Sequence, residues 1–131
     1  MEEDFKLEII SPEKIVFSDN AKMVTLPSYE GDMSVLKNHI SIITFLKPGI
    51  INIQKNKENF EKFFVQDGTV EYLNDSLIVL SSSATNIKDL SKNFLNNLEK
   101  TTQNKLVEKN ISDHDRYILN HKLDTIKNLR V

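Results

Sequence analysis

The sequence predicts a β-sandwich followed by an antiparallel α-helical hairpin. Short runs of β-branched and aromatic residues alternate with turn signals through roughly the first two thirds of the chain. All three glycines and all three prolines lie between residues 12 and 68. After Ser83 both residue types disappear, and apolar residues recur at helical spacing. Many short strands indicate an antiparallel sandwich or barrel, and the change of period indicates helices.

Eight runs in the first part have the composition of strands. In the first run, Phe5, Leu7 and Ile9 fall on one face, which is the pattern of a half-buried strand. Turn signals such as Pro48-Gly49 separate the runs. The runs cover residues 5–10, 14–17, 21–26, 39–45, 49–54, 62–66, 69–73 and 76–80.

Residues 30–39, EGDMSVLKNH, lie between two of these runs, and we expect them to form a loop. Gly31 indicates a turn, since glycine adopts backbone conformations that other residues avoid. His39 has no cysteine or second histidine nearby in the sequence with which to hold a metal.

The last part of the chain predicts two helices, at residues 88–107 and 113–129, joined by a short turn. Ser112 is a good N-cap, and Asp115 three residues later approximates a capping box. Asp113 also lies in the first turn, where the helix dipole favours anions. The apolar positions at helical spacing are Ile87, Leu90, Phe94 and Leu98, then Ile111, Ile118, Ile126 and Leu129.

Composition and charge divide the chain into the same two parts. Residues 1–86 hold 8 lysines and 13 acidic residues, a net charge of -5, whereas residues 87–131 hold 9 basic and 6 acidic residues, a net charge of +3. We therefore expect a β-sandwich domain over residues 1–86 and a helical hairpin over residues 87–131, with different partners. A chance distribution of charge on solvated faces is the alternative.

Several function classes are excluded or disfavoured by the residues present. Hydrophobic residues are 39% and charged residues 27%, which is globular composition rather than disorder. There is no cysteine, so the chain has neither a disulfide framework nor a thiolate metal site. His114 and His121 are two helical turns apart, roughly 10 Å, too far to share a metal without other ligands. No nucleophile elbow or P-loop is present, and we do not expect an enzyme.

The chain also lacks the signals of export or membrane insertion. Its longest apolar runs, such as SIITF, are far too short to span a bilayer, and its first residues are acidic. We expect a soluble chain that reaches a membrane only through a partner.

Together these features resemble the epsilon subunit of bacterial F-type ATP synthase, the counterpart of the mitochondrial delta subunit. The resemblance covers essentially the whole chain. It rests on the opening LEIISPEKIVFSDNAKMVTLP, on EG followed by VLKNHISIITFLKPGIINI, on DGTVEYLNDSLIVLSSSA, and on the terminal LRV. Ser34 stands where the family has a glycine, and Lys37-Asn38 replaces a Pro-Gly pair. Because Asn tolerates left-handed conformations, we expect the turn before His39 to survive.

The resemblance implies a non-catalytic rotor subunit of the central stalk. Its sandwich would contact the gamma subunit and the membrane-embedded c-ring, and so couple ion translocation to ATP synthesis. Its hairpin would restrain ATP hydrolysis through transient contact with the alpha/beta catalytic head. The subunit would lie on the cytoplasmic face of the bacterial inner membrane, peripheral to it. No metal, resident cofactor or nucleic-acid partner is implied.

The resemblance also suggests individual residues. Glu30, Asp32 and His39 would lie at the ring-facing end and contact the c-ring; the alternative is that this stretch only shapes a turn. Asp113 and Arg116 keep the D-x-x-R core of a motif with which some members bind ATP as a regulatory ligand, although an i,i+3 ion pair is the simpler explanation. Contacts of the inhibitory tail would come from Arg116, Lys122, Lys127 and Arg130.

A second function class stays open, a free-standing β-sandwich binding module with a helical dimerisation tail. Such a module, if it bound carbohydrate, would usually carry an exposed aromatic platform. The chain has no tryptophan, and its three tyrosines do not cluster in the sequence. This rival would not co-purify with a membrane-bound synthase.

Overall fold

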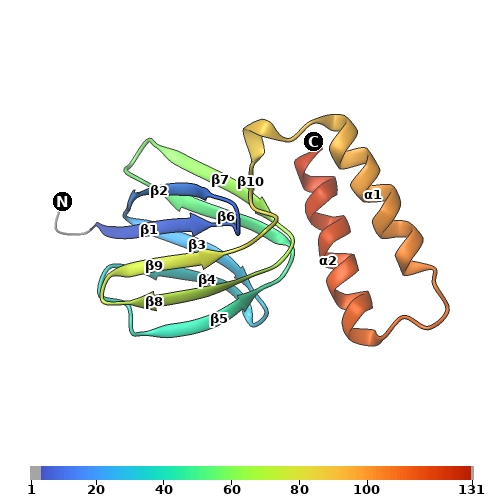
Figure 1. The fold of residues 1–131 in the computed structure, drawn as a ribbon, viewed down its shortest axis with the longest axis horizontal. Coiled ribbons are helices and arrows are strands. Elements are labelled where there is room, and N and C mark those ends of the chain that lie inside the picture. Colours follow the sequence, from blue (N-terminus) through green and yellow to red (C-terminus); the bar gives the residue numbers. More distant parts are fainter. Residues whose placement is uncertain (1–3, 131) are drawn as a thin grey trace.

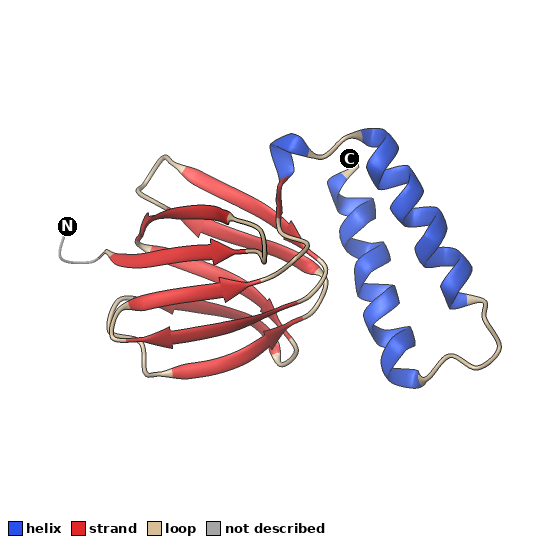
Figure 2. Cartoon of the chain, in the orientation of Figure 1, coloured by secondary structure: helices blue, strands red, loops and turns tan. Residues whose placement is uncertain are grey.

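A computed structural model describes residues 4–130 as a ten-stranded β-sandwich with a helical hairpin at one end (Figures 1 and 2), which confirms the predicted fold class. Residues 1–3 and 131, at the outer ends of the predicted spans 1–86 and 87–131, lie outside the described residues. The strands are β1 (Phe5–Ile10), β2 (Ile15–Ala21), β3 (Met23–Ser28), β4 (Gly31–Leu36), β5 (Ile42–Leu46), β6 (Gly49–Gln54), β7 (Phe60–Val65), β8 (Gly68–Leu73), β9 (Ser76–Leu80) and β10 (Thr85–Asn86). The 3-10 turn η1 (Ile87–Asp89) and the helices α1 (Lys92–Leu106) and α2 (Asp113–Leu129) follow.

The strands form two layers within one continuous hydrogen-bonded path. Its order is β10-β7-β6-β3-β5-β8-β9-β1-β2, with β4 on the other side of β3. Only the pair Ser28–Leu46 joins β3 to β5, so the sheet folds over at that point into two layers (Figure 1). The pairs are antiparallel, as expected, with the exception of β1 and β9, which run parallel.

The core between the layers is built by period-two alternation. Phe5, Leu7 and Ile9 of β1 are buried while Lys6 is exposed, as the sequence pattern predicts. Each fully buried Leu or Ile contributes about 1.5–3 kcal/mol relative to an exposed one. The other fully buried apolar side chains of the sandwich include Val24, Leu26, Val35, Ile51, Ile53, Leu77 and Val79.

The stretch 30–39 is not a single loop, which corrects the prediction. Gly31–Leu36 is strand β4 and pairs with β3 over its whole length, from Ser28–Gly31 to Met23–Leu36. Gly31 has a φ of +116°, so it does form the tight β3–β4 turn. The short strand β10 was not predicted either. Asn38 has a φ of 68°, which confirms that asparagine supplies the left-handed residue before His39.

Both helices begin at serine N-caps. The Ser112 side chain accepts a hydrogen bond from the Asp115 N–H at 3.0 Å, as predicted. Helix α1 begins at Lys92, four residues later than expected, because Asn86 caps the turn η1 and Leu90 is extended with a ψ of 123°. Ser91 then caps α1 by accepting from the Phe94 N–H at 3.0 Å.

The hairpin packs on the sandwich through α2, which lies between the strands and α1 (Figure 1). A small apolar cluster, here called the hairpin anchor, consists of the buried side chains Phe64 of β7, Leu95 of α1 and Ile126 of α2. Partly buried side chains surround it: Ile50, Ile87, Leu90, Leu98 and Leu129. The anchor holds both helices against one end of the sandwich.

Candidate functional site

The outer face of the layer β5-β8-β9-β1-β2 carries exposed apolar side chains in cross-strand rows. Phe45 pairs with Thr69, Thr69 with Leu80 and Leu80 with Ile10, so these side chains share the outer face. The row continues to Ile15 on β2. Phe45 is 58% exposed, Leu80 51% and Ile15 58%. This set, with Ile43 from the next row, is called the apolar face below.

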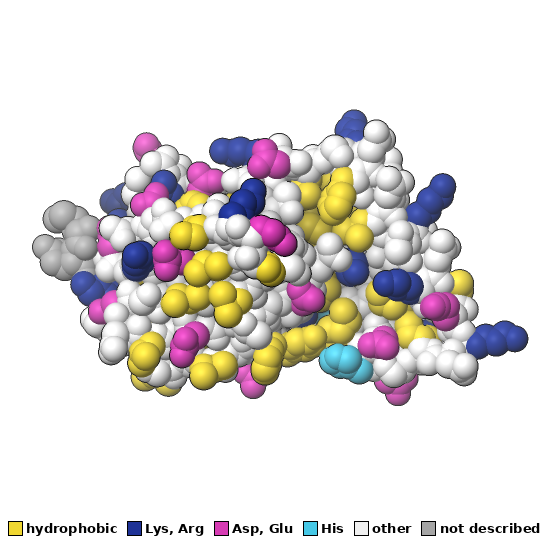
Figure 3. Space-filling model, viewed as in Figure 1, with side chains coloured by type: hydrophobic (Ala, Val, Ile, Leu, Met, Phe, Trp, Pro, Cys, Tyr) yellow, Lys and Arg dark blue, Asp and Glu magenta, His cyan; other side chains and the backbone are white. Residues whose placement is uncertain are grey.

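The next row places acidic groups among the apolar ones. Ile43, 74% exposed, pairs with Glu71, and Glu71 with Ile78, which neighbours Glu8 on β1. A shallow hollow of about 210 Å³ lies between Ile43, Glu71 and Leu80. Figure 3 shows hydrophobic side chains gathered over β9, β8 and β5 on the face turned to the viewer. An exposed apolar patch with a few charges is typical of a protein-protein contact.

A second, larger hollow of about 910 Å³ lies where the apolar face meets the hairpin. Phe45 and Leu80 line it from the sandwich, and Tyr29 and His114 line its other side. The Tyr29 and His114 rings stack with centroids 5.8 Å apart, so the β3–β4 turn contacts the first turn of α2. The hollow therefore joins the apolar face to the hairpin, with the polar side chains of Ser81 and Asp67 also in its lining.

The three predicted ring-contact residues do not lie together. Glu30 and Asp32 flank the β3–β4 turn, at the end of the sandwich that carries the hairpin. His39 lies after β4, at the opposite end, where its ring meets Tyr72 at 5.8 Å. The sequence treated them as one loop, but strand β4 separates them. None of these placements tests contact with a ring, which stays a prediction.

His39 belongs to a hydrogen-bonded turn cluster at that opposite end. The Asp75 carboxylate accepts from the Tyr72 hydroxyl at 2.7 Å and from the Asn38 N–H at 2.9 Å. Burial, followed by the bond to Asp75, raises the pKa of Tyr72 to about 12. The bond from Tyr72, then that from Asn38, lowers the pKa of Asp75. Asp75 thus ties the β4–β5 and β8–β9 turns together.

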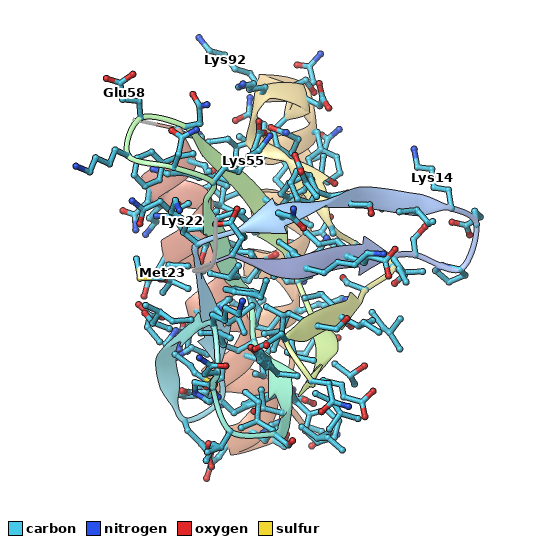
Figure 4. The ribbon with its side chains drawn as sticks, turned by 90° about the vertical axis from the view of Figure 1, so that its left-hand side faces the viewer. Lys14, Lys22, Met23, Lys55, Glu58 and Lys92 are labelled. Carbon is cyan, nitrogen blue, oxygen red and sulfur yellow. The ribbon has the colours of Figure 1, made fainter. Side chains whose placement is uncertain are left out.

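The same end of the sandwich carries two ion pairs. Figure 4 views the molecule from this side, with Lys22 and Lys55 rising from neighbouring turns. Lys22 Nζ lies 3.1 Å from Asp4 Oδ1, and Lys55 Nζ lies 2.7 Å from Asp19 Oδ2. The hydrogen bond with Lys55 lowers the pKa of Asp19 and raises that of Lys55. Both lysines therefore form ion pairs within the chain.

The predicted tail residues are not one patch. At 100° per residue, Arg116, Lys127 and Arg130 fall within about 60° of one another around α2, whereas Lys122 lies about 80–140° away. Arg130 pairs with Glu99 of α1, so it links the two helices. Lys122 is half-buried; desolvation, then the charge of Lys105, lowers its pKa, and Asp67 opposes this.

Asp113 and Arg116 are exposed on the first turn of α2. The ion pairs among residues 4–130 do not include an Asp113–Arg116 pair, so the simpler explanation for the D-x-x-R spacing is not realised here. Nucleotide binding by these two residues stays a prediction from the resemblance.

Residues 4–130 contain no group of three or more Asp, Glu, His or Cys side chains placed to hold a metal ion. Neither helix in this range is long and apolar enough to cross a bilayer.

Comparison with known proteins gives consistent matches. Residues 4–87 match the family described as ATP synthase, Delta/Epsilon chain, beta-sandwich domain. The ATP synthase epsilon chain of Pelagibacter ubique is 42% identical over 130 residues, covering 98% of this chain and 99% of that protein. The epsilon chain of Parvibaculum lavamentivorans is 32% identical over 130 residues, covering 99% and 98%.

Two solved structures share the whole fold. A chain of the Euglena gracilis mitochondrial ATP synthase, in its OSCP/F1/c-ring part, matches with a TM-score of 0.74 and 15% identity, covering 97% of this chain and 79% of that one. A chain of the Tetrahymena thermophila mitochondrial ATP synthase central stalk and c-ring matches with a TM-score of 0.60 and 13% identity, covering 95% and 92%.

Proposed function

The chain belongs to the family of ATP synthase delta/epsilon chains, and from this premise we propose that it is a non-catalytic subunit of the central stalk. In this role the sandwich binds the gamma subunit and the c-ring, and it couples ion translocation through the ring to ATP synthesis in the head. The chain is then peripheral, held at the cytoplasmic face of a bacterial inner membrane by the complex alone.

The observation that best supports this proposal is the apolar face, which we assign as the surface that binds the gamma subunit. Phe45, Leu80, Ile15 and Ile43 are each about half exposed or more in the isolated chain. Full burial of a side chain of this size contributes about 1.5–3 kcal/mol relative to full exposure, so covering one that is half exposed contributes roughly half as much. Glu71, within the face, favours a partner that presents a matching basic or hydrogen-bonding group.

Substitution of one face residue, with a matched control, tests the assignment. We expect Phe45→Asp to abolish co-purification with the synthase from detergent-solubilised membranes, because a carboxylate covered by the partner loses its hydration. Phe60→Asp on β7, in the other layer, is the control; Phe60 is similarly exposed, at 47%. Equal recovery of both variants would move the gamma contact to another surface. Failure of the native chain to co-purify would favour the free-standing binding module.

The ring contact divides into two alternatives, because Glu30 and Asp32 lie at one end of the sandwich and His39 at the other. The chain has no cysteine, so single variants Glu30→Cys and His39→Cys carry one photo-crosslinker each. In the assembled complex we expect c-ring adducts from one position only. Adducts from neither position would place the ring contact elsewhere.

We further propose that the hairpin restrains ATP hydrolysis when it leaves the sandwich and contacts the catalytic head. Removal of α2 by ending the chain after Leu106 should raise hydrolysis by the assembled enzyme and leave assembly intact. Arg116→Gln combined with Lys127→Gln should partly reproduce this effect, whereas Lys122→Gln should do so less, since Lys122 is half-buried on another side of α2. Higher salt should weaken the restraint by screening. Equal rates for all forms would leave the hairpin with a packing role only.

A further inference from the structure

The N-terminal half of α2 contacts the sandwich through rings and a lysine rather than through aliphatic packing. His114, Tyr117 and His121 fall within about 60° on one side of the helix. Tyr117 and His121 meet edge to face with centroids 4.4 Å apart. Lys47, from the β5–β6 turn, places its Nζ 3.4 Å from the Tyr117 hydroxyl and 5.7 Å from the ring centroid.

The backbone that carries Lys47 is held firmly in this contact. The Lys47 backbone N–H donates to the Pro27 carbonyl at 2.9 Å, and Gly49, two residues later, packs so closely on Pro27 that a Cβ would lie 2.6 Å from the proline Cβ. The β5–β6 turn therefore cannot easily move away from α2. The ammonium of Lys47 therefore stays within reach of α2, where it already lies 3.4 Å from the Tyr117 hydroxyl.

His121 lines a groove of about 720 Å³ between α2 and the sandwich. The charged side chains that share the groove with it are Lys47 of the β5–β6 turn, Asp32 of β4, Lys62 of β7 and Asp124 of α2 itself. Two cations and two carboxylates thus balance before His121 takes up a proton. The Asn52 Oδ1 atom, also in this groove, has no hydrogen-bond partner within the described chain.

We propose that docking of the hairpin on the sandwich is proton-sensitive: uptake of a proton by His121, beside Lys47, releases the N-terminal half of α2. An imidazolium and an ammonium in a partly desolvated groove repel each other more strongly than in bulk water. Release separates them and hydrates both. The hairpin anchor, formed by Phe64, Leu95 and Ile126, contains no titratable side chain and is unaffected directly.

The direction of the effect follows from the proton affinity of His121 in the docked state. Desolvation, then the charge of Lys47, lowers the pKa of His121, and Asp124 opposes this. Once undocked, His121 regains water and leaves Lys47, so its pKa returns toward the ordinary value of about 6.5. The docked form therefore binds fewer protons, and docking weakens as the pH falls through and below that value.

Single-molecule energy transfer in the full-length chain tests the proposal. Lys6→Cys on β1 and Asn120→Cys on α2 are exposed label sites in a chain without native cysteine. We expect the ratio of undocked to docked molecules to rise between about pH 7.5 and pH 5.5, by at most about tenfold for one group whose ordinary pKa is about 6.5. A ratio that stays constant over this range overturns the proposal.

Four variants locate the response. His121→Gln keeps a polar side chain without the charge change, and it should make the ratio independent of pH. Lys47→Gln should reduce the response, because the repulsion is removed. His39→Gln, at the opposite end of the sandwich, is the matched control and should retain the full response. A response that survives in His121→Gln, or that disappears in a His114→Gln variant while His121 is intact, overturns the proposal.

Discussion

The sandwich and the hairpin differ in how they are stabilised. The sandwich closes a continuous core in which Leu7, Ile9, Val24 and Ile53 are fully buried. The hairpin has no comparable interior: in α1 only Leu95 and Thr102 are buried, and the Thr102 hydroxyl is satisfied by the Leu98 carbonyl of its own helix at 2.7 Å. One region carries its own core, and the other shares a cluster with its neighbour. The hairpin is therefore the part that can change position without unfolding the rest.

Separation of the two regions should give the largest effect. We expect a fragment of residues 1–86 to keep its β structure and cooperative unfolding, and a fragment of residues 87–131 to lose nearly all helix. Helices of this length are marginal in water without tertiary packing. Circular dichroism of both fragments measures this. A helical 87–131 fragment, or an unstructured 1–86 fragment, would reverse the comparison.

Matched alanine substitutions, one in the sandwich core and one in the hairpin anchor, should show in the intact chain whether the two regions unfold independently. Leu77→Ala in β9 and Ile126→Ala in α2 both remove a side chain that is 0% exposed. Each should cost about 2–5 kcal/mol locally. We expect Leu77→Ala to lower the melting temperature of the whole chain and Ile126→Ala to lose amide protection only in α1 and α2. Hydrogen exchange resolved by segment distinguishes this from a single cooperative unit, in which both variants would expose the same amides.

High pH should destabilise the sandwich through Tyr72. The pKa of Tyr72 is raised to about 12, so its neutral form contributes stability below the ordinary pKa of about 10 and this is lost as the pH rises through 12. The loss is on the order of 2–3 kcal/mol. Denaturant melts between pH 9 and pH 12.5 measure it, with Tyr72→Phe as the control that should remove this dependence. At the acid end Asp75, whose pKa is lowered, should lose its contribution as the pH falls below its ordinary range.

Two glycines of the sandwich should respond to valine for different reasons. Gly31→Val should cost about 1–3 kcal/mol through backbone strain at a φ of +116°, since nothing lies within 4 Å of its added Cβ. Gly49→Val should cost a similar amount, about 1–3 kcal/mol, through overpacking against Pro27. A second substitution, Pro27→Gly, removes both clashing side-chain carbons, Cβ and Cγ, so it should relieve Gly49→Val but leave Gly31→Val unchanged. Thermal melts of the single and double variants check this, and equal rescue of both would contradict it.

The sequence predicts strands and helices well where side chains alternate cleanly. Phe5, Leu7 and Ile9 identify β1, and Ser112 fixes the start of α2. Strand β4 is missed because Gly31, Asp32 and Ser34 give its sequence the composition of a turn, although Val35 is fully buried in it. The missed strand changes the predicted ring-contact site. Because β4 separates Glu30 from His39, these two residues lie at opposite ends of the sandwich. Contacts between residues far apart in the sequence, such as that of Lys47 with Tyr117, could not be predicted, because neither segment carries a periodic pattern that indicates its partner.

The parallel pairing of β1 with β9 has a consequence for biosynthesis. Lys6 of β1 pairs with Ser76 of β9, which is synthesised about 70 residues later. At usual rates of translation this takes roughly 4–14 s, during which β1 cannot pair with β9. Until then β1 pairs only with β2, and its other edge is unpaired. Such an edge can pair with another nascent chain. We therefore expect the interval before β9 leaves the ribosome to be the time when a holding chaperone matters most, and the hairpin to be added to a sandwich that is already closed.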